Sequence, residues 1–394
     1  MAARISRSAR EWRNIAYQAV PRLVGQRGGA VLWPEVEGVL AHQQGWIAQH
    51  APELGPAQRL DPHILGVAKD LLVTAGVLRV APSTLQGRVV TAYVDGAAES
   101  DRRATEVERL AARKRRLYRS FLGWTGDAKL CGSVAERHIA ASLESVNGSA
   151  VWLDPSIGSG QARTVDGHKI SGGLDHAGHV ALDPSDPNKG FVAFLVEDKN
   201  VRSTVYPYHI EVWDLLCKAA DLPDRVPILI APRIYWTTYR LFSAIGALGI
   251  QTTRQWFAPE PAIETPKFNR VVRDLSLINS VQLQYPDQPS KPIGAFFTKT
   301  VHSRNEHHPD QSLIEHSRDL WRRAAPICAR PEYTELRTHN ITNRQELYRQ
   351  FVDELSAEGF DVDLLLPRHI VDGDGDGDED EEDIEWYDVI DDER

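Results

Sequence analysis

Three charged residues, Glu197, Asp198 and Lys199, follow directly on an apolar run in the segment 191–200, FVAFLVEDKN. Large apolar residues dominate the first six positions, which predicts a β-strand buried on both faces. Side chains alternate between the two faces of a strand, so Glu197 and Lys199 are predicted to project to one side and Asp198 to the other. A carboxylate and an ammonium side by side at the tip of a buried strand form half of a site for a metal ion and a phosphate.

A second carboxylate is available from Asp175, in the earlier strand-like segment 172–182. The intervening residues 183–190, DPSDPNKG, are rich in turn-forming types. An antiparallel pairing across this turn would bring Asp175 beside the tip of the segment 191–200. Mg²⁺ prefers oxygen ligands and keeps several waters, so converging carboxylates suit Mg²⁺ or Mn²⁺ better than histidines would.

The order of these residues resembles a known motif. Asp175, followed on the next strand by Glu197-x-Lys199, looks like the core motif of the PD-(D/E)xK nucleases, the restriction-endonuclease-like superfamily. Gly132 and Glu136, in the preceding helical segment, resemble the GxxxE pattern that places an extra acid beside the metal in many of these nucleases. The chain departs from the motif immediately before Asp175, where it has leucine in place of proline.

This resemblance covers roughly residues 129–257 and implies Mg²⁺-dependent hydrolysis of phosphodiester bonds. It assigns Asp175, Glu197 and Glu136 as metal ligands, with the carbonyl of Asp198 as a further one. It also implies that Lys199 positions the attacking water or stabilises the transition state. A Glu-x-Lys pair alone is a weak signal, so an ordinary inter-strand salt bridge in an unrelated α/β domain remains the alternative.

The elements that must position these residues alternate along the chain between residue 131 and residue 257. The order helix, strand, strand, helix, strand, helix, strand implies a mixed sheet with helices on both faces. Tyr208 and His209 begin the helix after the motif and are candidate substrate contacts, although aromatic residues at helix starts also commonly pack against the sheet. Histidines 176 and 179 flank Asp175 and are expected to lie in a solvent-facing loop.

The N-terminal residues predict helices followed by a hairpin. A helix over 61–75 has an N-cap aspartate and a proline at its first position, and Gly76 ends it. With a helix over 33–49 and two β-rich runs between 77 and 94, this segment resembles a winged helix-turn-helix domain. The 61–75 helix carries few cationic groups, so DNA-groove binding and a packing or dimerisation role both remain open.

The segment 101–119 is predicted to be a helical connector with eight Lys or Arg residues against three acids. Such a charge run is either a solvated helix face or a strip that contacts phosphates. In the second case Arg113, Lys114, Arg115 and Arg116 are weak candidates for substrate binding.

Charge is distributed unevenly along the 394 residues. The overall net charge is −10, but residues 372–394 hold fourteen acids against one arginine, which leaves the rest of the chain at about +3. We expect this segment to be a disordered acidic tail that is available for a protein partner. No run is long and apolar enough for a membrane span, and the N-terminus lacks the apolar region of a secretory signal, so a cytoplasmic protein is expected.

The remaining segment, 259–371, carries no catalytic pattern. It is expected to contain a strand pair at 281–285 and 293–300, and helices near 310–325 and 343–358.

The sequence thus predicts a multidomain α/β protein with a restriction-endonuclease-like sheet and an N-terminal winged helix. The predicted function is Mg²⁺-dependent cleavage of DNA, as in a prokaryotic restriction or anti-phage defence endonuclease, with a homodimer as a natural assembly. The alternatives are a non-catalytic DNA-binding regulator or adaptor and a protein-interaction module. The predicted segments are the winged-helix-like domain 1–98, the connector 99–128, the nuclease-like core 129–258, the α/β or helical region 259–371 and the tail 372–394.

Overall fold

The protein contains two compact units built from helices and several sheets, which confirms the predicted α/β class. Unit 1 comprises the described residues between 9 and 125 and between 265 and 277, and unit 2 comprises those between 128 and 257 and between 281 and 365. The division therefore differs from the predicted segments, because the connector belongs to unit 1 and the segment 259–371 is shared between the units. The computed structural model describes residues 9–41, 43, 45–54, 60–81, 91–96, 101–125, 128–154, 162–165, 167–201, 204–257, 265–277, 281–283, 288–304, 310–338, 343–362 and 365.

Unit 1 places helices against a three-stranded antiparallel sheet of order β1-β3-β2. The pairing of β2 with β3 confirms the predicted hairpin. Its predicted turn at 82–87 lies outside the described residues, as does the acidic tail. The elements of this unit are α1 (Ala9–Gln26), β1 (Ala30–Leu32), α2 (Trp33–Leu40), α3 (Trp46–His50), a 3-10 turn η1 (Pro52–Leu54), α4 (Pro62–Thr74), β2 (Leu78–Val80), β3 (Ala92–Asp95), α5 (Asp101–Thr125) and α9 (Thr265–Asp274).

Two predicted helices of unit 1 have different outcomes. The helix over 61–75 is confirmed as α4, and Gly76 follows it with a φ of 71°. The single helix expected over 33–49 is wrong, because α2 and α3 are separate. Gly45 precedes α3 with a φ of 76°, a left-handed conformation that favours glycine and breaks the helical path.

The connector helix α5 packs on the sheet of unit 1 and buries part of its charge. Lys114 donates a 2.8 Å hydrogen bond to Glu35 and another to the carbonyl of Ala30. Arg115 is 5% exposed and donates to the carbonyl of Ala81. The interpretation of Lys114 and Arg115 as phosphate contacts is therefore wrong, because both side chains serve packing inside unit 1. The neighbouring Arg113 and Arg116 are exposed.

Unit 2 is built on a five-stranded mixed sheet of order β10-β9-β8-β7-β4. Strand β8 pairs antiparallel with β7 and parallel with β9, as the predicted mixed sheet requires. The elements of this unit are α6 (Ala128–Glu144), β4 (Val151–Leu153), β5 (Ala162–Val165), β6 (His168–Leu174), β7 (His176–Ala181), η2 (Pro187–Lys189), β8 (Phe191–Asp198), α7 (Ile210–Ala220), β9 (Arg225–Ala231), α8 (Trp236–Ile245), β10 (Leu248–Gln251), β11 (Gln255–Phe257), β12 (Val281–Leu283), α10 (Lys291–Thr298), η3 (Thr300–His302), α11 (Leu313–Cys328), α12 (Pro331–Thr334), η4 (Glu335–Arg337) and α13 (Arg344–Ala357).

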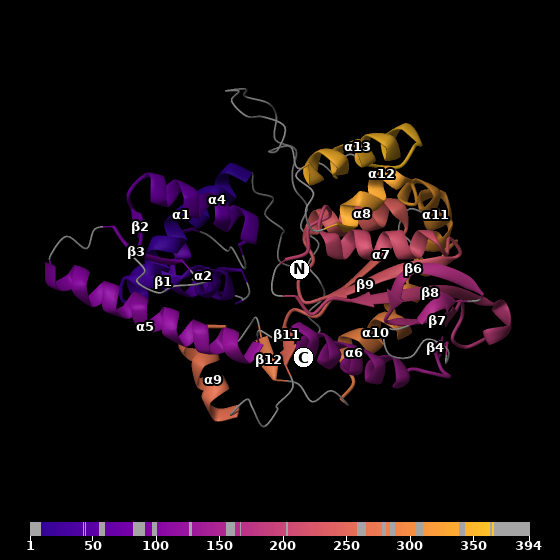
Figure 1. Cartoon of the computed structure of the whole chain (residues 1–394), viewed down its shortest axis with the longest axis horizontal. Coiled ribbons are helices and arrows are strands. Elements are labelled where there is room, and N and C mark those ends of the chain that lie inside the picture. The colour runs from indigo at the N-terminus through magenta and orange to yellow at the C-terminus, as the bar shows by residue number, and fades with distance from the viewer. Residues whose placement is uncertain are drawn as a thin grey trace. The chain divides into compact units, whose positions relative to one another are not determined.

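Helices cover both faces of this sheet, each over its own apolar core (Figure 1). Leu195 and Leu229 of the sheet pack in one core with α7, α8, α11 and α13. Phe194 and Val196 pack in the other core with α6 and α10. Burying a large apolar side chain contributes about 1.5–3 kcal/mol, so both helical layers hold β8 firmly in place.

One local prediction for unit 2 is wrong. Residues 293–300, expected as a strand, belong largely to helix α10, because Ile293 and Phe297 are four residues apart and both fully buried. Helix α8 ends at Gly246, which has a φ of 80°, and strand β10 follows. The helices predicted near 310–325 and 343–358 are confirmed as α11 and α13.

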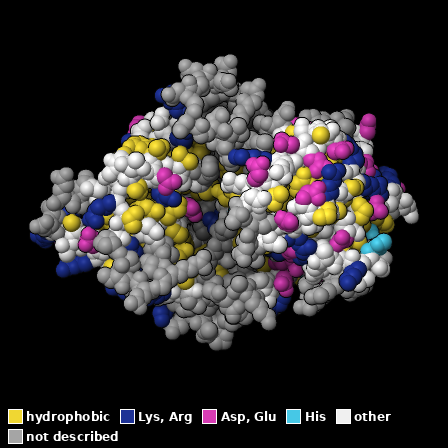
Figure 2. Space-filling view, turned by 45° about the horizontal axis from the view of Figure 1, so that its top comes forward, with side chains coloured by type: hydrophobic (Ala, Val, Ile, Leu, Met, Phe, Trp, Pro, Cys, Tyr) yellow, Lys and Arg dark blue, Asp and Glu magenta, His cyan; other side chains and the backbone are white. Residues whose placement is uncertain are grey.

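The surface of unit 2 mixes charges of both signs. On its face in Figure 2, Asp and Glu side chains are interspersed with Lys and Arg. Among the described helices, none is long and apolar enough to cross a membrane.

Candidate metal centre

The charged residues at the C-terminal end of strand β8 project to opposite faces of the sheet. The strand ends in Glu197 and Asp198, which pair with Leu229 and Ile230 of β9, and it is buried along most of its length. Because side chains alternate, Asp198 follows the face that packs on α6, whereas Glu197 follows the face that packs on α7. The charges predicted from the sequence are therefore divided between two environments.

Asp175 lies at the bend between β6 and β7, beside the tip of β8. The register pairs His176 with Val196, so the residue before His176 meets the last residues of β8. The carboxylate oxygen Oδ2 of Asp175 accepts a 2.8 Å hydrogen bond from the backbone N–H of Asp198. The predicted antiparallel pairing that brings Asp175 to the Glu-Asp-Lys sequence is confirmed.

Glu136 reaches the same point from helix α6. The helix packs Val134, Ala135 and Ile139 into the core below the sheet, which fixes the neighbouring turn that carries Glu136. One carboxylate oxygen each from Glu136, Asp175 and Asp198 lie within 4.8 Å of one another. Opposite ligands of Mg²⁺ are about 4.2 Å apart, so these three side chains are close to the spacing of a magnesium centre.

We call Glu136, Asp175 and Asp198 the acid cluster. The negative charge of its carboxylates is poorly compensated by the surrounding protein. Burial and the nearby carboxylate of Asp175 raise the pKa of both Glu136 and Asp198 above their usual values. The Oδ2 atom of Asp198 is buried and has no hydrogen-bond partner among the described residues. A buried carboxylate oxygen without a donor is unfavourable by itself and is satisfied by a cation, so the residues fit a divalent metal ion.

Glu197 does not belong to the acid cluster. Its Oε1 atom accepts hydrogen bonds from Lys199 at 2.6 Å and from Lys218 of α7 at 2.8 Å. The side chain is 3% exposed, and burial followed by the charge of Asp175 raises its pKa to about 7. The structure therefore differs from the sequence-based expectation at two residues. Asp198 offers its side-chain carboxylate to the acid cluster, where its backbone carbonyl was expected. Glu197, expected as a metal ligand, is bonded to two lysines.

A second cluster, the ion-pair network, surrounds Glu197 on the α7 face. Asp214 accepts from Lys218 at 2.9 Å, from Lys199 at 3.3 Å and from Arg337 at 2.8 Å. Burial opposes the ionised form of Asp214, but the bonds from these cations bring its pKa below its usual value. The ion-pair network consists of Glu197, Lys199, Asp214, Lys218 and Arg337.

Gly172 of β6 makes room for this network. A Cβ atom at Gly172 would lie 2.6 Å from Cε of Lys218 and 3.3 Å from a guanidinium nitrogen of Arg337. Any larger residue would push the lysine stem away from Glu197. Neither Lys218 nor Arg337 was singled out from the sequence, although Asp214 and Lys218 stand four residues apart on one helix face, a spacing typical of ion pairs.

Lys199 belongs to the ion-pair network and also acts on the acid cluster, because its charge favours the ionised form of Glu136. Burial lowers its pKa, but the adjacent Glu197 and Asp214 outweigh that effect and raise the pKa above its usual value. The amine therefore stays protonated at neutral pH. It offers a fixed positive charge and is not a proton acceptor.

A small recess adjoins one member of the acid cluster. Asp198 and Lys199 border this recess, and its apolar wall includes Ala135, Ile139 and Trp256. Asn200, the next residue, bonds to the backbone of Trp256 in both directions, so it fastens β11 to the end of β8. Of the three acids, Asp198 is the one that lines this recess.

His176 contributes to the site in a way that the sequence did not indicate. It was expected in a solvent-facing loop, but it lies in β7 and is 8% exposed. Its ring hydrogen-bonds to the backbone carbonyl of Glu136, which ties α6 to the strand beside Asp175, and burial lowers its pKa.

The weaker substrate candidates Tyr208 and His209 lie at the start of α7. Tyr208 stacks on Tyr206 at 5.7 Å and meets Tyr348 of α13 edge-on at 6.3 Å. His209 occupies the N-cap position of α7, and its ring lies 3.8 Å from Glu211. Both are half-buried in an aromatic group at the start of α7, which is the packing alternative.

No protein-family model, curated protein or solved structure matches this chain.

Proposed function

We propose that the chain is a metal-dependent nuclease that hydrolyses phosphodiester bonds of DNA with Mg²⁺ or Mn²⁺. The observation that carries this proposal is the acid cluster, in which Glu136, Asp175 and Asp198 converge within 4.8 Å beside a protonated lysine. Carboxylates with raised pKa values next to a fixed cation are typical of sites that bind a metal ion and a phosphate together. We also propose that residues 129–258 have the restriction-endonuclease-like fold.

The side chains divide the work according to their charge. Glu136, Asp175 and Asp198 would hold the ion, with Asp175 oriented by the backbone N–H of Asp198. When bound, Mg²⁺ lowers the pKa of a coordinated water and neutralises charge on phosphate oxygens. Lys199 would stabilise the additional negative charge that develops on the phosphate, because Glu197 and Asp214 keep it both protonated and in place.

Unit 1 supports the same proposal through its topology. Its strand order β1-β3-β2 with helices before and between the strands is the arrangement that we expect of a winged helix. The helix that would enter a DNA groove, α4, holds its described lysine Lys69 over the ring of Trp33 and 3.4 Å from Asp70. A winged helix beside a nuclease core is expected of a restriction or anti-phage defence enzyme acting as a homodimer, and this role rests on analogy.

The test is cleavage by the purified chain. Supercoiled plasmid, linear duplex DNA and RNA are each incubated with Mg²⁺, Mn²⁺ or EDTA. We expect cleavage of DNA that EDTA abolishes and that Asp198→Asn and Lys199→Ala remove. The matched control is Lys189→Ala, which changes an exposed lysine of unit 2 that is paired with Asp183 away from the acids and should leave the rate unchanged.

Each other outcome identifies a different class of protein. Cleavage that persists in EDTA or in both site variants overturns the metal-nuclease proposal. Binding of DNA without cleavage under any metal indicates the regulator or adaptor, and neither binding nor cleavage indicates the protein-interaction module.

A further inference from the structure

Helix α5 of unit 1 carries a stripe of cations without acids. After Glu108 the helix continues to Thr125 with no Asp or Glu. Within this stretch Arg109, Arg113 and Arg116 are exposed and recur at spacings of four and three, so they share one face.

The N-terminal part of the same helix is different because its acids are paired. Glu106 bonds to Arg102 and Glu108 to Arg79, each at 3.3 Å. Cation and acid therefore neutralise one another there, whereas positive charge accumulates beyond Glu108.

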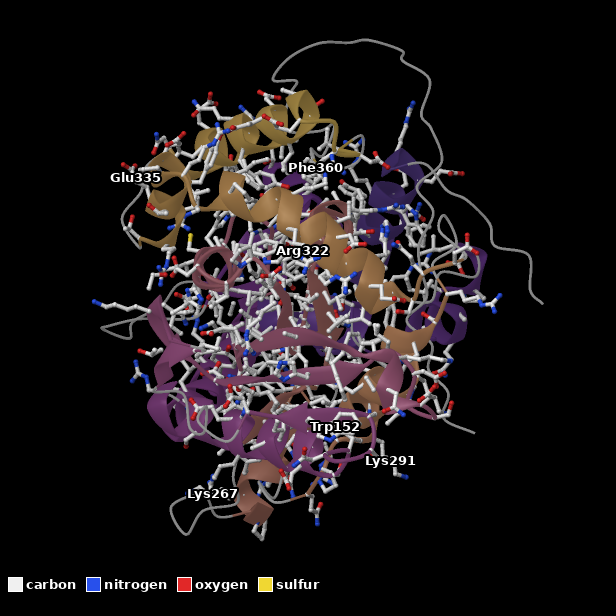
Figure 3. All side chains as sticks on the ribbon, turned by 90° about the vertical axis from the view of Figure 1, so that its right-hand side faces the viewer. Trp152, Lys267, Lys291, Arg322, Glu335 and Phe360 are labelled. Atoms are coloured by element: carbon white, nitrogen blue, oxygen red, sulfur yellow. The ribbon has the colours of Figure 1, made fainter. Side chains whose placement is uncertain are left out.

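Helix α9, from a distant part of the sequence, brings further cations to unit 1 on a helix that packs against α5. It packs against α5 through Phe268 and Phe121, whose rings lie 6.0 Å apart (Figure 1). With Phe268, Val271 and Val272 buried, α9 presents Arg270 and Arg273 to solvent. Lys267, labelled in Figure 3, also lies exposed on this helix.

Five arginines, the α5–α9 surface, thus lie on two packed helices of one unit. Within the described part of the chain, none of their guanidinium groups has an ion-pair partner. The surface consists of Arg109, Arg113, Arg116, Arg270 and Arg273.

We propose that the α5–α9 surface binds the phosphate backbone of nucleic acid without reading its sequence. Seven residues of helix from Arg109 to Arg116 span about 10 Å, and that length of duplex carries about six phosphate charges. Exposed arginines match phosphate oxygens in geometry and charge. The inference deepens the proposed nuclease function, on which it rests for the choice of partner.

Three double variants of the full chain test the surface. Arg113→Gln with Arg116→Gln changes α5, and Arg270→Gln with Arg273→Gln changes α9. The matched control, Arg10→Gln with Arg13→Gln, removes the same charge from exposed positions of α1. Binding of a fluorescent 30-base-pair duplex is measured in EDTA between 50 and 200 mM salt, and circular dichroism melting verifies that each variant is folded.

We expect the α5 and α9 variants each to reduce the slope of log affinity against log salt by about 2, and the control to leave it unchanged. The loss of affinity between 50 and 200 mM salt then shrinks about tenfold in each variant. Slopes equal to that of the unaltered chain, or no binding of duplex at any salt, overturn the inference. So does binding of a polyglutamate peptide in place of the duplex, which would identify an acidic protein as the partner.

The binding assay is separable from the cleavage assay because EDTA prevents metal-dependent cutting. A chain that binds through these arginines but never cleaves DNA would remove the proposed function and leave the surface intact. A chain that cleaves DNA with unaltered salt slopes would do the reverse.

Discussion

Two groups of charged side chains lie at the same end of one sheet and have opposite electrostatic character. In the acid cluster, the buried Oδ2 atom of Asp198 has no donor among the described residues. In the ion-pair network, Glu197 and Asp214 each accept from two lysines, although the second oxygen of Glu197, Oε2, also has no donor among those residues. The two groups are separated only by the alternation of side chains along β8.

The difference indicates which group of charges is balanced by the protein itself and which would be stabilised by a bound cation. Buried charges are stable when they are paired and hydrogen-bonded. The ion-pair network comes nearer to that condition, because two lysines pair with both of its carboxylates. In the acid cluster, burial and mutual repulsion raise the pKa values of Glu136 and Asp198. Buried carboxylates that repel one another are stabilised by a bound cation, as in a metal site. The ion-pair network instead holds Lys199 in place.

The largest effect is expected when the two neighbours at the tip of β8 are neutralised in turn. Asp198→Asn should lower the rate of plasmid cleavage at least about 10³-fold, because a metal ligand supplies several kilocalories per mole of transition-state stabilisation. Glu197→Gln should lower it only about tenfold, because Asp214 still holds Lys199. Single-turnover kinetics of the conversion of supercoiled to nicked plasmid measures the cleavage rates of both variants. A larger loss for Glu197→Gln would break the comparison and assign Glu197 to the metal.

The next effect is stabilisation by Mg²⁺. At about 100 times its Kd, a ligand specific for the folded state adds about 2.7 kcal/mol, which is about 5–10 °C in the melting temperature of a unit of this size. The shift should be full at pH 8 and diminish towards pH 5.5, because the raised pKa values let protons compete for Glu136 and Asp198. Differential scanning fluorimetry measures the shift.

The control for this prediction is Asp183→Asn, a partly exposed acid of unit 2 paired with Lys189, which should keep the full Mg²⁺ shift. Asp198→Asn should lose the shift. An Mg²⁺ shift of equal size at both pH values, or one that survives in Asp198→Asn, would locate the ion elsewhere.

A third effect concerns the network. Lys218→Met should destabilise the protein by about 2 kcal/mol in urea unfolding, because Glu197 then keeps one of its two donors in a buried site. Combining it with Glu197→Gln should recover at least about 1 kcal/mol, since the unpaired charge is removed. If the two losses simply add, Lys218 does not act through Glu197.

The elements around the site were largely predictable because local pattern and burial agree there. The apolar run before Glu197, the turn-rich segment before it and the helix after it each have one consistent interpretation, and the structure follows them. The failures occurred where tertiary contacts decide. Residues 293–300 were expected in a strand, yet the four-residue spacing of Ile293 and Phe297 places both side chains in the core from one face of a helix.

The identity of the converging acids was only partly predictable. The sequence indicates that Asp175 and the tip of β8 meet, but the choice between Glu197 and Asp198 depends on which face each strand residue presents to α6. Lys218 and Arg337 come from distant helices, so no local spacing connects them to Glu197. The burial of Lys114 likewise follows from Glu35, a partner 79 residues away.

The smallest effect compares two aspartates on the two sides of the sheet. Asp198→Asn should stabilise the metal-free protein by about 1 kcal/mol at pH 8, because its raised pKa means that ionisation in the folded state is unfavourable. Asp214→Asn should destabilise it by a similar amount, because its lowered pKa reflects favourable bonds to Lys218 and Arg337.

The two effects should depend differently on pH. For Asp198 the gain in stability should vanish below its unfolded pKa near 3.8, where the group is protonated in both states. For Asp214 the loss should fade as the pH drops through its folded pKa. Urea unfolding in EDTA at pH 8 and at pH 4 gives the four values, and changes of the same sign at pH 8 would show that the two clusters do not differ as described.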